Sequence, residues 1–155
     1  MKDEILGYIK KLNSQYYKLI LLVGKTGSGK TRMLKYLAAS TGRTVLDLNI
    51  ELSKMLKSIP KNERCLYVQD FLDEILRQTN GRPVFLDNTE ILFSSHLQID
   101  PIGTLKNSSR YYPLVAAING FIDNNRLIYA DRNHPDYITY KVDELKCRYY
   151  FFRGE

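Results

Sequence analysis

Residues 18–31 read KLILLVGKTGSGKT, and this stretch decides the fold. The aliphatic run 18–23 is too short for a helix and passes directly into glycines, which is typical of a buried strand. From Lys30 onward apolar residues recur at helical spacing, and Gly42 offers a left-handed stop. The stretch therefore predicts a strand, a glycine-rich turn and a helix in immediate succession.

The turn itself fits the phosphate-binding pattern G-x-x-x-x-G-K-[ST] in full, in the strand-to-helix context that its mechanism requires. Glycines let backbone N–H groups turn toward a phosphate chain without obstruction by Cβ, and the helix adds the positive end of its dipole. We therefore predict an ATP site of the P-loop (Walker A) kind. Its nucleotide-binding residues are Gly24, Lys25, Thr26, Gly27, Ser28, Gly29, Lys30 and Thr31.

Individual roles follow from the same motif. The Lys30 ammonium is placed to reach the β and γ phosphates, and the Thr31 hydroxyl to ligate magnesium. The apolar run 84–86 ends in Asp87, which puts a carboxylate at the carboxyl edge of a sheet, where such folds bind ligands. We expect Asp87 to hold the magnesium through water. ATP and magnesium are thus the predicted cofactors, with Thr31 and Asp87 as metal residues.

Two further polar residues are candidates for catalysis. Asn88 follows Asp87 where many ATPases have a water-polarising glutamate, and the next carboxylate is Glu90. Glu90 is either the base for the attacking water or a solvated loop residue. Asn119 is either a sensor of the γ-phosphate or part of a plain Asn-Gly turn with Gly120. Fast hydrolysis is therefore not expected.

The remaining pattern alternates strands with helices, which predicts an α/β fold with a mostly parallel sheet flanked by helices. We expect an N-terminal helix with Ile5, Ile9, Leu12 and Tyr16 on one face. Further strands are expected at 44–48, 84–87 and 114–118, and further helices at 52–59, around 71–76 and at 102–109. The tail departs from this alternation, with strands at 126–130 and 137–142. The whole chain, 1–155, is predicted to be a single P-loop NTPase domain, AAA/ASCE-like, with a β-rich C-terminal tail.

Composition limits the other possibilities. The chain has 155 residues and a formal charge of +6, and its basic residues are scattered along the sequence. Its longest apolar run is far shorter than the ~20 residues of a membrane span, and its N-terminus lacks a signal-peptide pattern, so we expect a cytoplasmic protein without membrane contact. The two cysteines lack partners at metal-ligand spacing, which favours two buried thiols.

Parts of the sequence are also compatible with three other functions. A GTPase is suggested by Asn133 and Asp136, but His134 replaces the lysine of the guanine-reading motif. A small-molecule kinase needs an arginine-rich lid, and the arginines after Asp87 are dispersed. A non-catalytic switch or scaffold that depends on bound ATP remains open. We expect the bound nucleotide to carry adenine.

Beyond these general motifs, the sequence resembles the BrxF family, the small P-loop proteins of type 3 BREX (bacteriophage exclusion) defence systems. The resemblance covers most of the chain. It rests on LLVGKTGSGKT at 21–31, LNIELS at 48–53, FLDNTEILF at 85–93, Asn119-Gly120, Tyr129-Ala130 and HPDY at 134–137.

The resemblance implies an ATP-binding component of a multi-protein system that marks host DNA by methylation and blocks phage replication. It also implies that Asn88 belongs to the family pattern and that modest hydrolysis is usual. Asn49 and Glu51 would lie near the ATP edge in a sheet ordered as in AAA-type ATPases, or else simply cap the surface.

The positive charge and the lack of a lid over the nucleotide suggest which partners the chain has. We expect self-association or contact with other BREX proteins, with Arg110 or Arg126 as candidates to complete a neighbour's site. DNA contact is expected through a partner protein rather than directly, because no helix gathers basic residues on one face. The tail 148–153 is either a final core strand or a stacking platform for bases.

Overall fold

The aliphatic stretch that precedes the glycines forms β1 (Leu19–Gly24), a strand in which every residue is buried. The computed structural model describes residues 1–154. Within them β1 pairs in parallel with β4 (Leu114–Asn119) on one side and with β8 (Arg148–Phe152) on the other. A strand buried on both faces and both edges needs no polar positions, which explains its uninterrupted aliphatic sequence.

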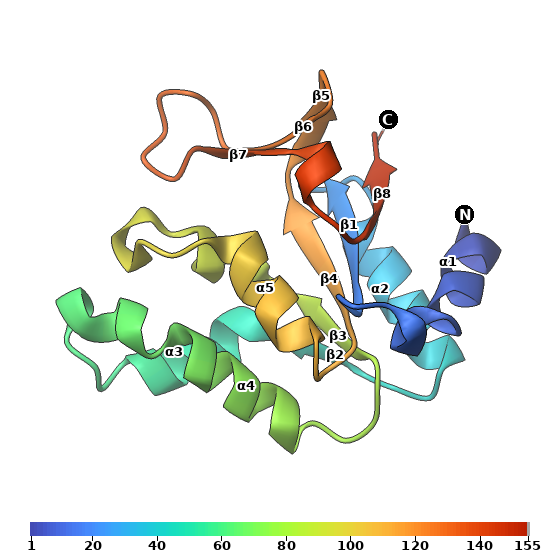
Figure 1. The fold of residues 1–155 in the computed structure, drawn as a ribbon, viewed down its shortest axis with the longest axis horizontal. Coiled ribbons are helices and arrows are strands. Elements are labelled where there is room, and N and C mark those ends of the chain that lie inside the picture. The colour runs from blue at the N-terminus through green and yellow to red at the C-terminus, as the bar shows by residue number, and fades with distance from the viewer. Residues whose placement is uncertain (155) are drawn as a thin grey trace.

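Two shorter strands complete the parallel sheet. β3 (Val84–Asp87) pairs with β4, and β2 (Val45–Asp47) pairs with β3, so the strand order is β2-β3-β4-β1-β8. β4 therefore separates the strand before the glycine loop from the strand that ends in Asp87 (Figure 1). This order confirms the predicted α/β fold with an AAA/ASCE-like parallel sheet.

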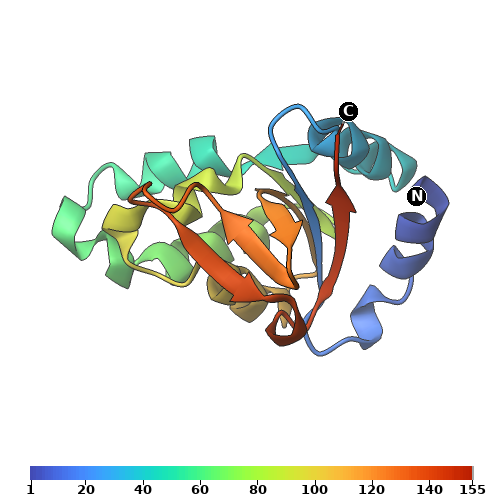
Figure 2. The same ribbon diagram turned by 90° about the horizontal axis from the view of Figure 1, so that it is seen from above.

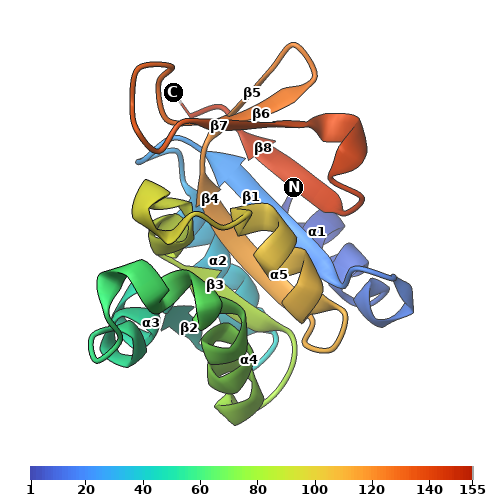
Figure 3. The ribbon, with the colours of Figure 1, turned by 60° about the vertical axis from the view of Figure 1, so that its left-hand side comes forward.

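Helices cover both faces of the sheet (Figure 3). One face packs against α1 (Lys2–Ile9) and α2 (Lys30–Ser40), and the other against α3 (Leu48–Leu56), α4 (Val68–Gln78) and α5 (Pro101–Ser109).

Strand alternation decides which residue meets which layer. In β1, Ile20 and Leu22 join the core beneath α1 and α2, while Leu19, Leu21 and Val23 join the core beneath the other three helices. Complete burial of one such side chain contributes about 1.5–3 kcal/mol, so β1 stabilises both layers at once.

A second, antiparallel sheet lies beyond the carboxyl ends of β1 and β4 (Figures 1 and 2). It consists of β5 (Phe121–Asp123), β6 (Arg126–Tyr129) and β7 (Ile138–Lys141) in that order. The sequence predicts β6 and β7 but not β5, a strand of three residues. Asn124 and Asn125 join β5 to β6 with positive φ angles of 48° and 60°, the backbone of a tight hairpin turn.

Short 3-10 turns connect these elements. They are η1 (Leu12–Ser14), η2 (Lys61–Leu66), η3 (Thr89–Phe93), η4 (Ser95–Leu97) and η5 (Val142–Glu144).

The tail is a core strand. Tyr150 is buried among Ile20, Leu22 and α2 residues, whereas Arg148 and Arg153 are exposed at the two ends of β8. The structure therefore confirms the interpretation of 148–153 as a final strand with solvated ends.

Two sequence predictions are corrected. Tyr16 is not on the buried face of an N-terminal helix: α1 ends at Ile9, and the chain turns through η1, leaving Tyr16 62% exposed. The helix expected from residue 52 begins at Leu48 instead, because the Asp47 carboxylate accepts a hydrogen bond from the N–H of Ile50 and caps it there.

The cysteines and helices add two smaller findings. Cys65 and Cys147 are unpaired and half-buried rather than fully buried, and burial raises the pKa of the Cys147 thiol to about 12. Among residues 1–154 no helix combines the length and the apolar character needed to cross a membrane.

The end of β1 generates a stability prediction. A Cβ at Gly24 would lie 2.7 Å from the carbonyl oxygen of Phe152, a backbone atom of β8 that cannot rotate away. Gly24→Ala should therefore lower the free energy of unfolding by about 1–3 kcal/mol, measured by urea denaturation.

Gly7 provides the matched control, because a Cβ there meets nothing within 4 Å and the residue lies within α1. Gly7→Ala should raise the free energy of unfolding by about 0.5–1 kcal/mol. Equal effects of the two substitutions would contradict the close packing of β8 on Gly24.

Candidate functional site

The carboxyl edge of the parallel sheet carries a cavity of about 610 Å³. Residues 26–32 form one wall, and Asp87, Asn88, Glu90 and Asn119 form the other. Gly154 closes one end, because the chain after β8 passes beside Ser28 (Figure 2). The glycine loop, the end of β3 and the end of β4 are thus brought together at one place.

The glycine loop adopts the backbone that the motif requires. Gly27 and Gly29 have φ angles of +82° and +107°, which L side chains rarely adopt, and Gly29 directly precedes α2. The N–H groups of the first turn of α2 lack partners within the helix and point toward the loop. Gly24 and Lys25 do not line this cavity: Gly24 packs beneath the loop, and the Lys25 ammonium lies 4.9 Å over the Phe121 ring.

Lys30 is a buried cation at the base of the cavity, with 6% of its surface exposed. Its ammonium donates a hydrogen bond to the carbonyl oxygen of Lys25, 2.8 Å away, which holds the side chain back along the loop. Burial lowers the pKa of Lys30, while the Glu90 and Asp87 carboxylates act in the opposite direction. A partly desolvated cation of this kind interacts strongly with a phosphate.

Thr31 and Asp87 meet across the cavity. The Thr31 hydroxyl donates to Asp87 Oδ2 at 2.9 Å, although the two residues lie on different elements. A hydroxyl and a carboxylate are the hard oxygen donors that magnesium prefers, and magnesium usually takes only one or two protein ligands beside phosphate and water. The residues present therefore fit a magnesium ion bound with a nucleotide.

Asp87 is held in place by its neighbour. The N–H of Asn88 donates to Asp87 Oδ1 at 2.9 Å, and Asn88 has a left-handed backbone with φ of 54°. The Asn88 amide in turn donates to Asp47 Oδ2 at 2.6 Å. Because Asp47 also caps α3, this helix is linked through Asn88 to the carboxylate at the end of β3.

Asp47 was not predicted as a site residue. Asn49 and Glu51, for which a place near the ATP edge and a surface role were both left open, do not line the cavity. Asn49 instead accepts a hydrogen bond from Ser53 within α3. Asn49 is therefore a surface residue of α3 and does not take part in the cavity. The sequence did hold a signal for Asp47, because this carboxylate lies near the end of a predicted strand and Asp87 lies at the end of another. In the structure the two residues are paired in neighbouring strands.

Glu90 and Asn119 form a second polar pair. The Asn119 amide donates to Glu90 Oε1 at 2.5 Å, and both side chains are half-buried. Thr89, next to Glu90, ties the start of η3 to β4 by donating its hydroxyl to the carbonyl oxygen of Ala117 at 2.6 Å. The structure thus places Glu90 inside the cavity rather than in a solvated loop, and it engages Asn119 through its side chain.

The antiparallel sheet supports this segment from behind. The Tyr129 ring packs on Phe93 with centroids 4.1 Å apart, and the Asp136 carboxylate accepts from the N–H of Ser95 at 2.7 Å. Burial, with smaller contributions from Glu90 and Asp136, raises the pKa of Tyr129 to about 12. Asp136, the last residue of the GTPase-like motif, thus holds η4.

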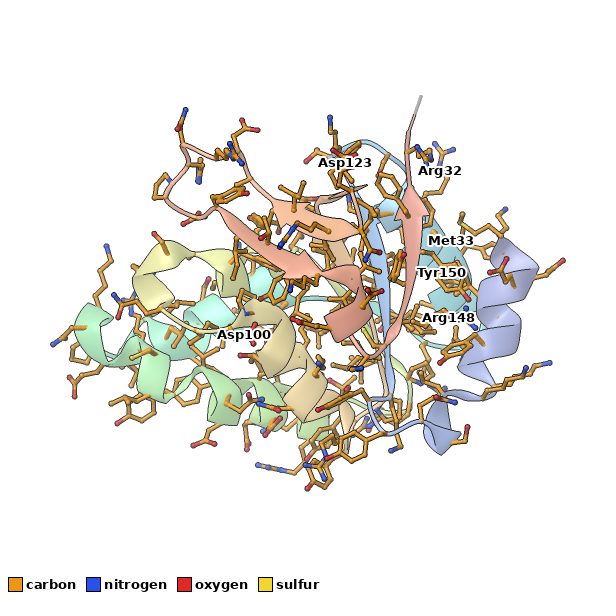
Figure 4. The ribbon with its side chains drawn as sticks, turned by 45° about the horizontal axis from the view of Figure 1, so that its top comes forward. Arg32, Met33, Asp100, Asp123, Arg148 and Tyr150 are labelled. Atoms are coloured by element: carbon orange, nitrogen blue, oxygen red, sulfur yellow. The ribbon has the colours of Figure 1, made fainter. Side chains whose placement is uncertain are left out.

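Three residues that line the cavity were not predicted: Arg32, Asn88 as a lining group, and Gly154. Arg32 follows the motif directly (Figure 4). Its position in the first turn of α2 was a sufficient signal. For Gly154 there was none, because only tertiary structure brings β8 beside β1.

Comparisons with known proteins add little. No family model matches the chain, and no curated protein matches it. Among solved structures the chain is similar to C. elegans PCH-2, with 22% sequence identity and a TM-score of 0.45. The match covers 79% of this chain and 38% of the PCH-2 chain, so this chain spans well under half of that protein. The P-loop NTPase fold stated here rests on the strand order and the loop geometry.

The link through Asp47 generates a prediction with a matched control. Asp100 caps α5 in the same way, accepting from the Gly103 N–H, and also accepts from the Tyr140 hydroxyl. Asp47→Ala and Asp100→Ala should each cost about 0.5–2 kcal/mol of stability through the lost cap.

Only Asp47→Ala should also weaken the magnesium-dependent binding of ATP expected at this cavity. The expected loss is about tenfold, because Asn88 would no longer be held against Asp87. Titration of both purified variants with ATP and magnesium checks this. Equal ATP affinities in the two variants would remove Asp47 from the support of the site.

Proposed function

We propose that the chain is an ATPase that binds Mg-ATP at the carboxyl-edge cavity and hydrolyses it slowly. The observation that carries this proposal is the meeting of three groups in one cavity: the buried Lys30 ammonium, the Thr31–Asp87 pair and the Glu90–Asn119 pair. Each would meet a different requirement of phosphoryl transfer. Lys30 would neutralise the charge of the phosphates, the Thr31–Asp87 pair would hold the metal ion, and the Glu90–Asn119 pair would act on the attacking water.

Binding would use the loop and the helix start. The backbone N–H groups of residues 27–31 and the Lys30 ammonium would hold the phosphates, and Thr31 and Asp87 would hold the magnesium ion. Bound magnesium neutralises charge on the phosphate oxygens and orients them. Asp87 is fixed for this task by the Asn88 N–H.

Hydrolysis would use Glu90 as the base. Its carboxylate lies in the cavity and would accept a proton from a water molecule, while the Asn119 amide orients it. A slow rate is proposed because Asn88, and not a glutamate, directly follows Asp87. Glu90 stands three residues after Asp87, whereas many ATPases have the water-polarising glutamate directly after the aspartate.

A second function is favoured by that same pairing. If Glu90 serves only to hold Asn119 and the end of β4, the chain would be an ATP-dependent switch or scaffold without turnover. The segment that carries Glu90 is tied to the antiparallel sheet through Phe93 and Ser95, so occupancy of the cavity would be transmitted to that sheet.

The wider role is proposed from the sequence resemblance to the BrxF family. We infer an ATP-binding subunit of a cytoplasmic BREX-type phage-defence complex, working by assembly or switching of a DNA-acting machine. The carboxyl edge is open to a second protein, so self-association or contact with another subunit would complete the site. A strictly monomeric chain in light scattering with and without ATP, together with full activity, would contradict this.

Lys30→Ala should lower ATP affinity by at least about tenfold, because it removes a buried cation that is positioned for the phosphates. Lys35→Ala is the matched control, since Lys35 lies on the same helix and is exposed. Fluorescence titration with a labelled ATP analogue measures both. Unchanged affinity in the Lys30 variant would contradict the proposed binding site.

Glu90→Gln separates the ATPase from the scaffold. A water-activating carboxylate contributes about 10²- to 10⁴-fold to the rate, so phosphate release should fall by that factor while ATP binding is retained. Glu74→Gln, on α4 away from the cavity, should leave the rate unchanged. If the parent hydrolyses ATP and the Glu90 variant does so equally fast, Glu90 is not the base.

A further inference from the structure

The opposite edge of the parallel sheet, where β1 begins, carries an unusual surface. The segment 10–18 before β1 and the segment 106–113 between α5 and β4 lie side by side there (Figure 3). They are joined by hydrogen bonds from the N–H of Lys18 to the Ser109 carbonyl oxygen and from the N–H of Leu114 to the Lys18 carbonyl oxygen. Neither segment contains an Asp or a Glu.

Cations and tyrosines make up much of both segments. The first contributes three lysines and two tyrosines, and the second contributes one lysine, one arginine and two tyrosines. We call Tyr16, Tyr17, Lys18, Lys106, Arg110 and Tyr111 the amino-edge cluster.

Two of the three rings of the cluster are exposed, Tyr17 is half-buried, and all three lie beside cations. The Arg110 guanidinium lies 4.6 Å from the centroid of the Tyr16 ring and 5.7 Å from that of Tyr111. Lys106 lies 4.6 Å from the Tyr17 ring, which in turn meets Tyr16 edge-on with centroids 4.7 Å apart. Tyr16 and Tyr111 are nevertheless 62% and 72% exposed.

The cluster borders an open hollow of about 450 Å³. Tyr16, Lys18, Arg110 and Tyr111 line it, together with the polar residues 13–15. The Lys18 ammonium is fixed at its rim by donating to the carbonyl oxygens of Gln15 and Arg110, at 3.0 and 3.3 Å. Positive charge and flat apolar rings therefore face one concave surface.

The basic character continues beyond the hollow. Past Lys106, Lys146 lies just before β8 and Arg148 begins that strand (Figure 4). The Arg148 guanidinium lies 4.5 Å over the Tyr8 ring of α1. Acidic residues also lie on this side: Asp73 of α4 accepts a hydrogen bond from the Ser108 hydroxyl at 2.6 Å, and η5 carries two more. Asp143 accepts a hydrogen bond from Asn125, and Glu144 is exposed, with its carbonyl oxygen facing Lys106.

The sequence favours contact with DNA through a partner protein, but the amino-edge cluster offers a direct site. We propose that it binds single-stranded nucleic acid. Bases stack on the exposed Tyr16 and Tyr111 rings, and Lys18, Lys106 and Arg110 contact the phosphates. A charged backbone beside flat bases matches the alternation of cations and rings in the hollow.

Two observations favour this ligand over others. The two segments together carry five cations and no carboxylate, a charge distribution that attracts phosphates. Duplex DNA is read by a helix or a β-ribbon in a groove, and this surface is built from turns and loop segments around a hollow. Unpaired bases, in contrast, can enter a concave surface and stack.

The site is separate from the ATP cavity. β1 has six residues between the two, and at about 3.3 Å per residue the separation is about 20 Å. The Tyr16 and Tyr111 variants should therefore bind ATP like the parent, and a failure of this proposal leaves the proposed ATPase untouched.

The test is fluorescence anisotropy of the full chain with labelled oligothymidylate, oligouridylate and duplex DNA, each of about 20 nucleotides or base pairs, longer than one site. The parent should bind the single strands more tightly than the duplex, and affinity should fall steeply with salt. The two single-stranded arms decide between DNA and RNA.

Tyr16→Ala and Tyr111→Ala should each weaken single-strand binding by about 5- to 150-fold, the range of one lost base stack. Arg110→Ala should also reduce the salt dependence. Tyr36→Ala is the matched control, because Tyr36 is another exposed tyrosine beneath a lysine, with Lys2 4.4 Å from its ring, on α2.

Equal losses in the Tyr36 control and in the cluster variants would overturn the proposal. So would a parent that binds none of the oligonucleotides at low salt. If instead the cluster variants alter only the association state of the chain, the surface is a protein contact, and the nucleic-acid site is wrong.

Discussion

The position of the carboxyl end of β1 in the sheet determines how the cavity at the carboxyl edge is built. Gly24 pairs with Asn119 of β4 on one side and with Phe152 of β8 on the other, so the glycine loop leaves the sheet at the level of both neighbours. The close approach of the Phe152 backbone leaves no room for a side chain at Gly24. From this fixed point the loop reaches α2, and Thr31 arrives opposite Asp87. Every polar group of the cavity is positioned relative to that strand end.

Much of this could be predicted from the sequence, because the relevant signals are local. Residues 19–31 contain strand, turn and helix signals without interruption, and the run 84–87 places a carboxylate at a strand end. The helix predicted at 102–109 is likewise confirmed as α5, whose first turn the Asp100 carboxylate caps. Where one short segment determines both the element and its polar residue, burial and capping act within a few residues.

The rest depends on contacts between distant segments. Asp47 and Asn88 are 41 residues apart, and their hydrogen bond exists only because β2 lies beside β3. Tyr16 has the spacing of a buried helical residue, yet the chain turns at η1 and the ring stacks on Arg110 instead. The hairpin strand β5 escaped prediction because it spans three residues and depends on pairing with β6. In each case tertiary structure overrides the local pattern.

The two ends of β1 thus carry different chemistry, with glycines, a lysine and carboxylates at one end and tyrosines with cations at the other. The central claim concerns the first. Isothermal titration of the full chain with ATP, in magnesium and then with a chelator, tests it most directly. The account predicts one ATP bound per chain. Its affinity should fall when magnesium is removed, because Thr31 and Asp87 contribute to ATP binding only through the ion. Absence of ATP binding under both conditions would contradict the account.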